Sequence, residues 1–165
     1  MTEVSVSARE EAVAQFRRRA DSQENSDPAD LDAIWAALPV VQVEELIGSW
    51  VGGELPTGHP MDGQLPVVKW HGKTFNSWFD VKPMVCRNDD GELYSNTEIG
   101  KGEASAWMVG FRGETTASMI YDGQPVIDHF KRVDDKTLMG IMNGKTSLVR
   151  DHHFYFFLVR EDSPE

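Results

Sequence analysis

Apolar side chains recur with two different periods along this chain, and the change of period divides it. In residues 5–20 they follow the three-to-four-residue spacing of one helix face. Residues 28–38 repeat that spacing after Asp27-Pro28, a pair suited to the cap and first turn of a helix. From Ile47 onward, short apolar runs alternate with turn residues. We therefore predict a helical leader over residues 1–40 and a single β domain over 41–165.

Turn pairs divide the second part of the chain into strands. Asp-Gly and Asn-Gly are strong hairpin signals because the tight turns that they form need positive φ. They occur at 90–91, 122–123 and 143–144. The runs between turns predict strands over 81–88, 92–97, 104–112, 115–121, 125–133, 136–142 and 152–160. Residues 70–79, with four aromatic side chains, are predicted to form a short helix or a lid segment.

Several of these strands are apolar on both faces. Every side chain in residues 154–159 is aliphatic or aromatic, whereas a sheet with one solvent face would alternate apolar with polar positions. Both faces therefore need cover. A barrel interior on one side and the leader helices on the other would supply it, and a filled core with a homodimer interface is the alternative. We predict a mainly β protein, an antiparallel barrel preceded by two helices.

Composition and charge narrow the classes of partner. The chain has 165 residues, enough for one domain, and a formal net charge of −11. Acidic character argues against binding of nucleic acid or of an anionic membrane surface, both of which attract basic patches. A single cysteine, Cys86, excludes an intrachain disulfide and a zinc site built on paired cysteines. No run of about 18 apolar residues predicts a membrane span, and no basic-then-apolar start predicts a signal peptide. We expect a cytoplasmic location.

The segment Gly48-Ser49-Trp50-Val51-Gly52 opens the β domain. A Trp between two glycines on a first strand suits the closed end of a small barrel, where the ring fills the floor and the glycines allow close approach. With residues 70–75, 119–130, 138–142 and 154–160, this segment makes the chain resemble the GXWXG protein family. The resemblance implies a compact calycin-like barrel, similar to lipocalins and nitrobindins, without a settled activity. In lipocalins a late Arg packs over the first-strand Trp, so the resemblance implies that Arg160 stacks on Trp50.

A barrel interior rich in aromatic and Met side chains predicts noncovalent binding of a small hydrophobic molecule, a fatty acid or another lipid-like compound. No metal-ligand spacing is present, and we predict neither a metal site nor a resident cofactor. The side chains predicted to line the cavity are Trp70, Phe75, Trp107, Met108, Met119, Tyr121, His129, Met139 and Phe156.

Two alternative functions depend on residues 126–130. A haem-binding protein similar to nitrobindins would use His129 as the axial ligand. A small cofactor-free isomerase, cyclase or lyase would use Asp128 or His129 as an acid or base in an apolar cavity. The simpler interpretation of Asp128 is a surface ion pair with Arg132 on the same strand face.

Overall fold

The structure is a computed structural model that describes residues 5–145 and 152–161. Its helices are α1 (Val6–Ser22), α2 (Pro28–Ala37), α3 (Val43–Leu46), α4 (Gln64–Val67) and α5 (Thr97–Gly100). Its strands are β1 (Gly48–Glu54), β2 (Trp70–Ser77), β3 (Asp80–Arg87), β4 (Leu93–Ser95), β5 (Ala104–Phe111), β6 (Glu114–Tyr121), β7 (Ile127–Asp134), β8 (Thr137–Asn143) and β9 (Phe154–Arg160).

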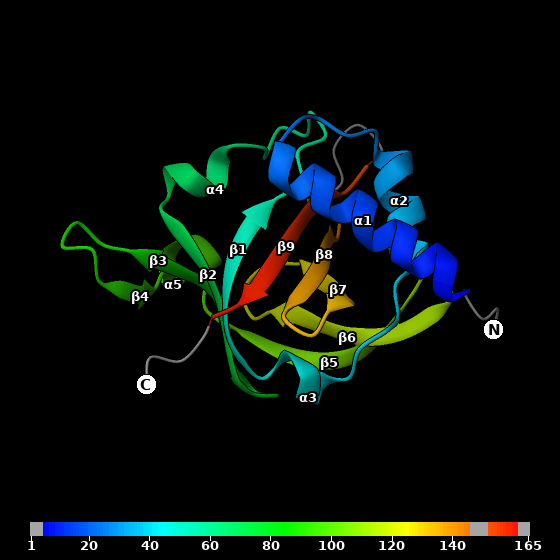
Figure 1. Ribbon diagram of the computed structural model, residues 1–165. Helices are drawn as coiled ribbons and strands as arrows, with labels where there is room; N and C mark the ends of the chain where they lie inside the picture. The colour runs from blue at the N-terminus through cyan, green and yellow to red at the C-terminus, as the bar shows by residue number, and fades with distance from the viewer. Residues whose placement is uncertain (1–4, 146–151, 162–165) are drawn as a thin grey trace.

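Eight of the strands in the described part of the chain close into an antiparallel barrel (Figure 1). Their order is β2-β1-β9-β8-β7-β6-β5-β3, and β3 pairs back onto β2. The short β4 pairs with β3 outside this ring. The β3–β5 contact is a single bridge, Val81 to Ala104, and Ala106 also donates its amide hydrogen to the Trp78 carbonyl at 2.6 Å. The predicted fold class, a mainly β antiparallel barrel with two N-terminal helices, is confirmed.

Residues 70–79 differ from the prediction. They form β2 and the turn into β3, not a helix or a lid segment. Their aromatic residues are spaced as on a helix because they pack at two different locations. Phe75 is buried in the barrel, whereas Trp78 and Phe79 lie at the hairpin and contact Trp107 edge to face. The short helices α4 and α5 also lie in segments for which we predicted no helix.

The two leader helices pack on the outer face of the barrel, across β8 and β9 (Figure 1). Ser5 caps α1 by accepting from the Ala8 amide at 3.1 Å, and Asp27 caps α2 through the Ala29 amide at 2.9 Å. The residues buried between helices and barrel are Ala12, Phe16, Leu31, Ile34, Trp35, Leu38, Leu55, Val133, Met139, Ile141 and Tyr155. The predicted docking of Ile34, Trp35 and Leu38 on the barrel is confirmed.

This docking explains the two-sided strands. Along β9, Phe154, Phe156 and Leu158 belong to the barrel interior, while Tyr155 lies in the cluster under the leader. Burial of both strand faces is what a near-continuous apolar run requires. The leader therefore covers Tyr155 and Phe157 on the outer face of β9, while Val159 at its far end is 39% exposed.

Trp50 closes one end of the barrel. Its ring is buried, and its indole N–H donates to the Leu46 carbonyl at 2.8 Å. The Arg160 guanidinium lies 4.2 Å from the ring centroid and donates to the carbonyls of Ile47 at 2.8 Å and Glu45 at 2.9 Å. The stacking of Arg160 on Trp50 is therefore confirmed.

The two glycines of the motif are both sterically required. Gly48 has φ +133°, and a Cβ there would run into the Arg160 guanidinium. A Cβ on Gly52 would overlap the Trp70 indole. The two glycines therefore leave room for two side chains: the Arg160 guanidinium at Gly48, which with Trp50 forms the Arg160 clamp, and the Trp70 indole at Gly52.

Candidate functional site

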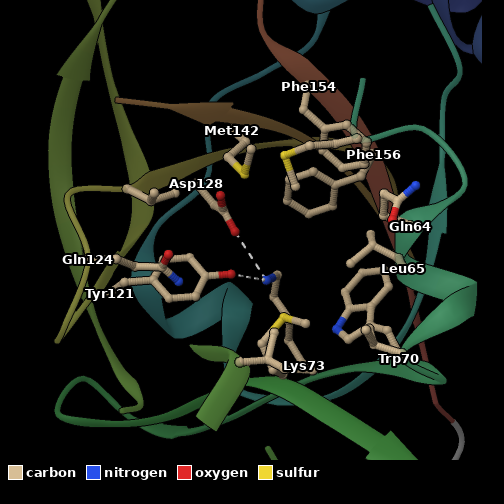
Figure 2. Close-up of a pocket in the computed structure, with 15 residues that line it drawn as sticks. Gln64, Leu65, Trp70, Lys73, Tyr121, Gln124, Asp128, Met142, Phe154 and Phe156 are labelled. Carbon is tan, nitrogen blue, oxygen red and sulfur yellow. Dashed lines mark hydrogen bonds and ion pairs between the residues drawn. The ribbon is translucent and has the colours of Figure 1, made fainter. Parts of the chain in front are cut away.

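A cavity of about 290 Å³ lies inside the barrel. The exposed lining residues Gln64 and Ile99 place its mouth beside α4 and α5. Its walls are mainly aromatic, aliphatic and Met side chains, with a polar group at the centre (Figure 2). The lining residues are Met61, Gln64, Leu65, Val68, Trp70, Lys73, Met84, Ile99, Tyr121, Gln124, Val126, Asp128, Met142, Phe154 and Phe156.

A buried lysine forms the centre of this polar group. Lys73 stands in the middle of β2, opposite Trp50 of β1, and its side chain is 3% exposed. The ammonium has three donors, and three oxygens surround it. These oxygens are Oδ2 of Asp128 at 3.1 Å, the Pro83 carbonyl at 3.3 Å and the Tyr121 hydroxyl at 3.4 Å. The donor capacity of Lys73 is therefore filled by the protein itself.

Aromatic rings surround the same ammonium. The rings of Trp70, Tyr121 and Phe156 have centroids 5.4–5.6 Å from Nζ, within the range of cation–π attraction. Trp70 is held in place by its indole N–H, which donates to the Pro83 carbonyl at 3.2 Å. A charge in an apolar barrel is thus stabilised by one anion, two neutral oxygens and three π faces.

Asp128 of β7 supplies the anion and is 2% exposed. Burial raises its pKa from the ordinary value, and the charge and hydrogen bond of Lys73 act in the opposite direction. Only Oδ2 reaches Lys73. Among the described residues, Oδ1 has no hydrogen-bond partner. An unpartnered buried oxygen on a wall of the cavity is an acceptor that a ligand can use.

The expected surface pair of Asp128 with Arg132 is wrong. Arg132 binds Glu45 at 3.3 Å instead. Asp128 belongs to the barrel interior and faces Lys73 of a distant strand, a pairing that only barrel closure creates.

Tyr121, the last residue of β6, completes the polar group. Burial, with the charge of Asp128 in second place, raises the pKa of its phenol well above the ordinary value. The phenol therefore keeps its proton. Its oxygen accepts from Lys73, and an ammonium cannot accept a hydrogen bond in return. The Tyr121 proton is thus left to donate elsewhere, and the hydroxyl points to the same centre as Asp128 (Figure 2).

Three of the residues predicted to line the cavity do so: Trp70, Tyr121 and Phe156. Phe75 and Met119 lie in the buried barrel core, and Met108 packs against that core, but none of the three is in the cavity wall. Trp107 is 41% exposed on the outer surface. Met139 lies under the leader helices.

His129 also lies outside the cavity, because it alternates with Asp128 along β7 and faces outward. Its ring stacks on Phe111 with centroids 4.0 Å apart. Nε2 lies 3.0 Å from the Asn143 amide nitrogen, which donates to it, and Nδ1 lies 2.8 Å from the Ser118 hydroxyl. The Ser118 hydroxyl donates its own hydrogen bond to the Thr116 carbonyl at 3.1 Å.

This hydrogen-bond chain uses both ring nitrogens of His129. Burial lowers the pKa of His129 to about 4, with His153 and Arg112 adding to the effect, so the ring is neutral near neutral pH. Neither nitrogen is directed at the cavity. The haem alternative therefore loses the axial ligand on which it was based.

Sequence reasoning missed the centre of the site. Lys73 is the clearest case, since a lone lysine in a segment predicted to be a helix or lid gives no sign of burial. The lining residues in 61–68 were missed because this segment, a turn followed by the short helix α4, reaches the cavity only through the tertiary fold. Lys73 could have been found only by first assigning β2 as a strand, because Lys73 then shares a strand face with the apolar Phe75.

Across the parts of the chain that the structure describes, no three His, Cys, Asp or Glu side chains gather in a way that could hold a metal ion. Within the same ranges, no helix combines the length and the apolar character needed to cross a membrane.

Comparison with known proteins agrees with the fold. Residues 33–91 match the family described as GXWXG protein, and residues 102–160 match a domain of unknown function, DUF4334. The chain belongs to the GXWXG protein family. The two family segments meet in the site: the GXWXG segment carries Lys73 and the DUF4334 segment carries Tyr121 and Asp128.

A solved structure extends the similarity to nearly the whole chain. The crystal structure of a protein from Thermomonospora curvata is 35% identical, with a TM-score of 0.83, and the match covers 92% of this GXWXG protein and 99% of that chain. No curated protein matches the sequence.

Proposed function

We propose that this GXWXG protein binds a compact, uncharged and mainly apolar molecule that carries a hydroxyl or carbonyl group. The observation that carries the proposal is Oδ1 of Asp128, a buried acceptor without a partner in the described structure, in the wall of an apolar cavity. A ligand hydroxyl would donate to Oδ1 and accept from Tyr121. A ligand carbonyl would accept from Tyr121 alone.

The walls and the size of the cavity support a small apolar skeleton. A volume of about 290 Å³ is at the lower end of the range for ligand sites, which favours a compact molecule over a bulky one. Met61, Met84 and Met142 contribute three thioether side chains, which adapt to irregular apolar shapes. Trp70, Phe154 and Phe156 add flat apolar surface.

The charges favour a neutral ligand over a fatty-acid anion. Lys73 is already paired with Asp128, and its donors are filled. A bound carboxylate would meet the free oxygen of Asp128 without a free cation beside it, which is an unfavourable like-charge contact. A neutral alcohol or ketone meets complementary hydrogen-bonding groups instead.

Three eight-carbon probes separate these classes: 1-octanol, 2-octanone and octanoate. Binding is followed by the tryptophan fluorescence, because Trp70 lines the cavity, and by isothermal titration calorimetry. We expect saturable binding of octanol and octanone and at least tenfold weaker binding of octanoate. Loss of a buried hydrogen bond in Tyr121→Phe should weaken octanol binding by about 1–2 kcal/mol.

The control is Phe79→Ala, which removes a 72% exposed aromatic ring outside the cavity and should leave all three affinities unchanged. Equal or tighter binding of octanoate would contradict the proposed preference for neutral ligands. Absence of saturable binding for every probe, with the protein folded, would contradict the binding function.

A further inference from the structure

We propose that the Asp128–Tyr121 pair catalyses proton transfer next to a carbonyl, so that the protein is an isomerase for compact β,γ-unsaturated ketones. This inference rests on the proposed function, since it concerns the same cavity. It adds two catalytic roles. Asp128 is the base that removes and returns a proton, and Tyr121 is the hydrogen-bond donor to the carbonyl oxygen.

The base role needs a lone pair that is free and buried. Oδ1 of Asp128 has no partner in the described structure, and Oδ2 is held by Lys73 at 3.1 Å, which fixes the orientation of the carboxylate. The raised pKa makes the ionised group a stronger base than an exposed aspartate. The surrounding walls are apolar, which keeps water from competing for the proton.

The donor role needs a neutral hydroxyl whose proton is not already used. Tyr121 accepts from Lys73 at 3.4 Å, so its own proton is directed elsewhere. As negative charge develops on the carbonyl oxygen, this hydrogen bond strengthens, and the Lys73 ammonium behind it stabilises the same charge. The Lys73 ammonium is a neighbour of both groups, so the two face one bound molecule from a common centre.

The step balances without an oxidant or a metal. Asp128 removes a proton from the carbon between the carbonyl and the alkene, and that C–H bond breaks. Its electron pair forms a new double bond, and the charge moves onto the carbonyl oxygen, which Tyr121 binds. The dienolate then takes the same proton from Asp128 at the γ-carbon. The product is the conjugated α,β-unsaturated ketone, and Asp128 is an anion again.

The test substrate is 4-octen-2-one, which has the methyl-ketone skeleton of the binding probe 2-octanone. Isomerisation gives 3-octen-2-one, and the ultraviolet absorbance of the conjugated product measures the rate. We expect saturable catalysis by the wild-type protein. Asp128→Asn should lower kcat at least 100-fold, as expected for loss of a general base. Tyr121→Phe should lower it about 10- to 100-fold. In D2O, the wild-type protein should also catalyse deuterium uptake at C1 and C3 of 2-octanone.

Binding of 2-octanone distinguishes this inference from the proposed function. If 2-octanone binds but the wild-type protein isomerises 4-octen-2-one no faster than Asp128→Asn does, the catalytic inference is wrong and the binding function stands. If 2-octanone does not bind, the catalytic inference fails, and if 1-octanol and octanoate do not bind either, the binding function fails with it. Because Asp128→Asn leaves Lys73 without its anion, the variant Lys73→Met/Asp128→Asn is measured beside it. If this folded variant keeps the wild-type rate, Asp128 is not the base. Phe79→Ala should retain full activity.

Discussion

Replacing Lys73 by Met tests whether the buried ion pair is built as described. Met has nearly the same length and keeps apolar contact with Trp70 and Phe156, so the change removes mainly the charge. Both partners are almost completely buried, at 3% and 2% exposure. Removal of one partner from a buried pair typically costs about 3–5 kcal/mol, because the other charge stays unpaired. Against a total stability of about 5–15 kcal/mol, this loss is easily measured by urea unfolding.

The loss should also depend on pH in a defined direction. Without Lys73, the pKa of the buried Asp128 rises further, since the remaining cause, burial, acts alone. An acid whose pKa is higher in the folded state than in the unfolded state binds extra protons on folding, so stability falls as pH rises through that window. Lys73→Met should therefore recover stability as pH falls through the raised pKa of Asp128 towards its ordinary value of 3.8, and Lys73→Met/Asp128→Asn should be closer to wild type at neutral pH.

The matched control is Lys82→Met, which breaks surface pairs with Asp80 and Glu103 and should cost less than about 1 kcal/mol. An equal effect of the two substitutions, or a loss at Lys73 that does not change with pH, would refute the assignment of a buried Lys73–Asp128 pair.

Three further predictions concern the outer face and the closed end of the barrel. The NMR titration of His129 should give a pKa of about 4, and a pKa near 6.5 would contradict its burial. The stability of the protein should fall as pH drops from 6.5 towards 4, because the ring takes up a proton in the unfolded state first. Trp35→Ala should lower the free energy of unfolding by about 3–5 kcal/mol, while the exposed Val67→Ala should change it little; equal effects would mean that the leader is loosely attached. Arg160→Met should cost about 1–2 kcal/mol in urea and alter the fluorescence of Trp50, and an unchanged protein would argue against the clamp.

The barrel was predictable from local signals. Hairpin pairs such as Asp90-Gly91, in which Gly91 has φ +80°, mark turns through backbone preference alone. The apolar faces of residues 154–159 require two layers of cover. The Arg160 clamp came from the family resemblance. These features depend on residues close in sequence or on a known motif.

The site was less predictable because barrel closure creates it. Lys73 and Asp128 lie on β2 and β7, which are not neighbours in the sheet, and no local pattern relates them. Strand alternation identifies two faces but not which one is inside. The prediction therefore placed His129 and Met139 in the interior, although His129 faces outward against Phe111 and Met139 lies under the leader helices. Trp107 shows the same error, since an aromatic side chain in a strand can remain on the surface.

A crystal structure with bound 8-bromo-1-octanol tests the central claim most directly. The bromine gives an anomalous signal that locates the end of the alkyl chain, and the electron density locates the hydroxyl. We predict the bromoalkyl chain among the Met and aromatic walls, with the hydroxyl within hydrogen-bond distance of Asp128 Oδ1 and the Tyr121 hydroxyl. A bromoalcohol bound outside the barrel, or inside it with its hydroxyl away from both groups, would contradict the proposed site.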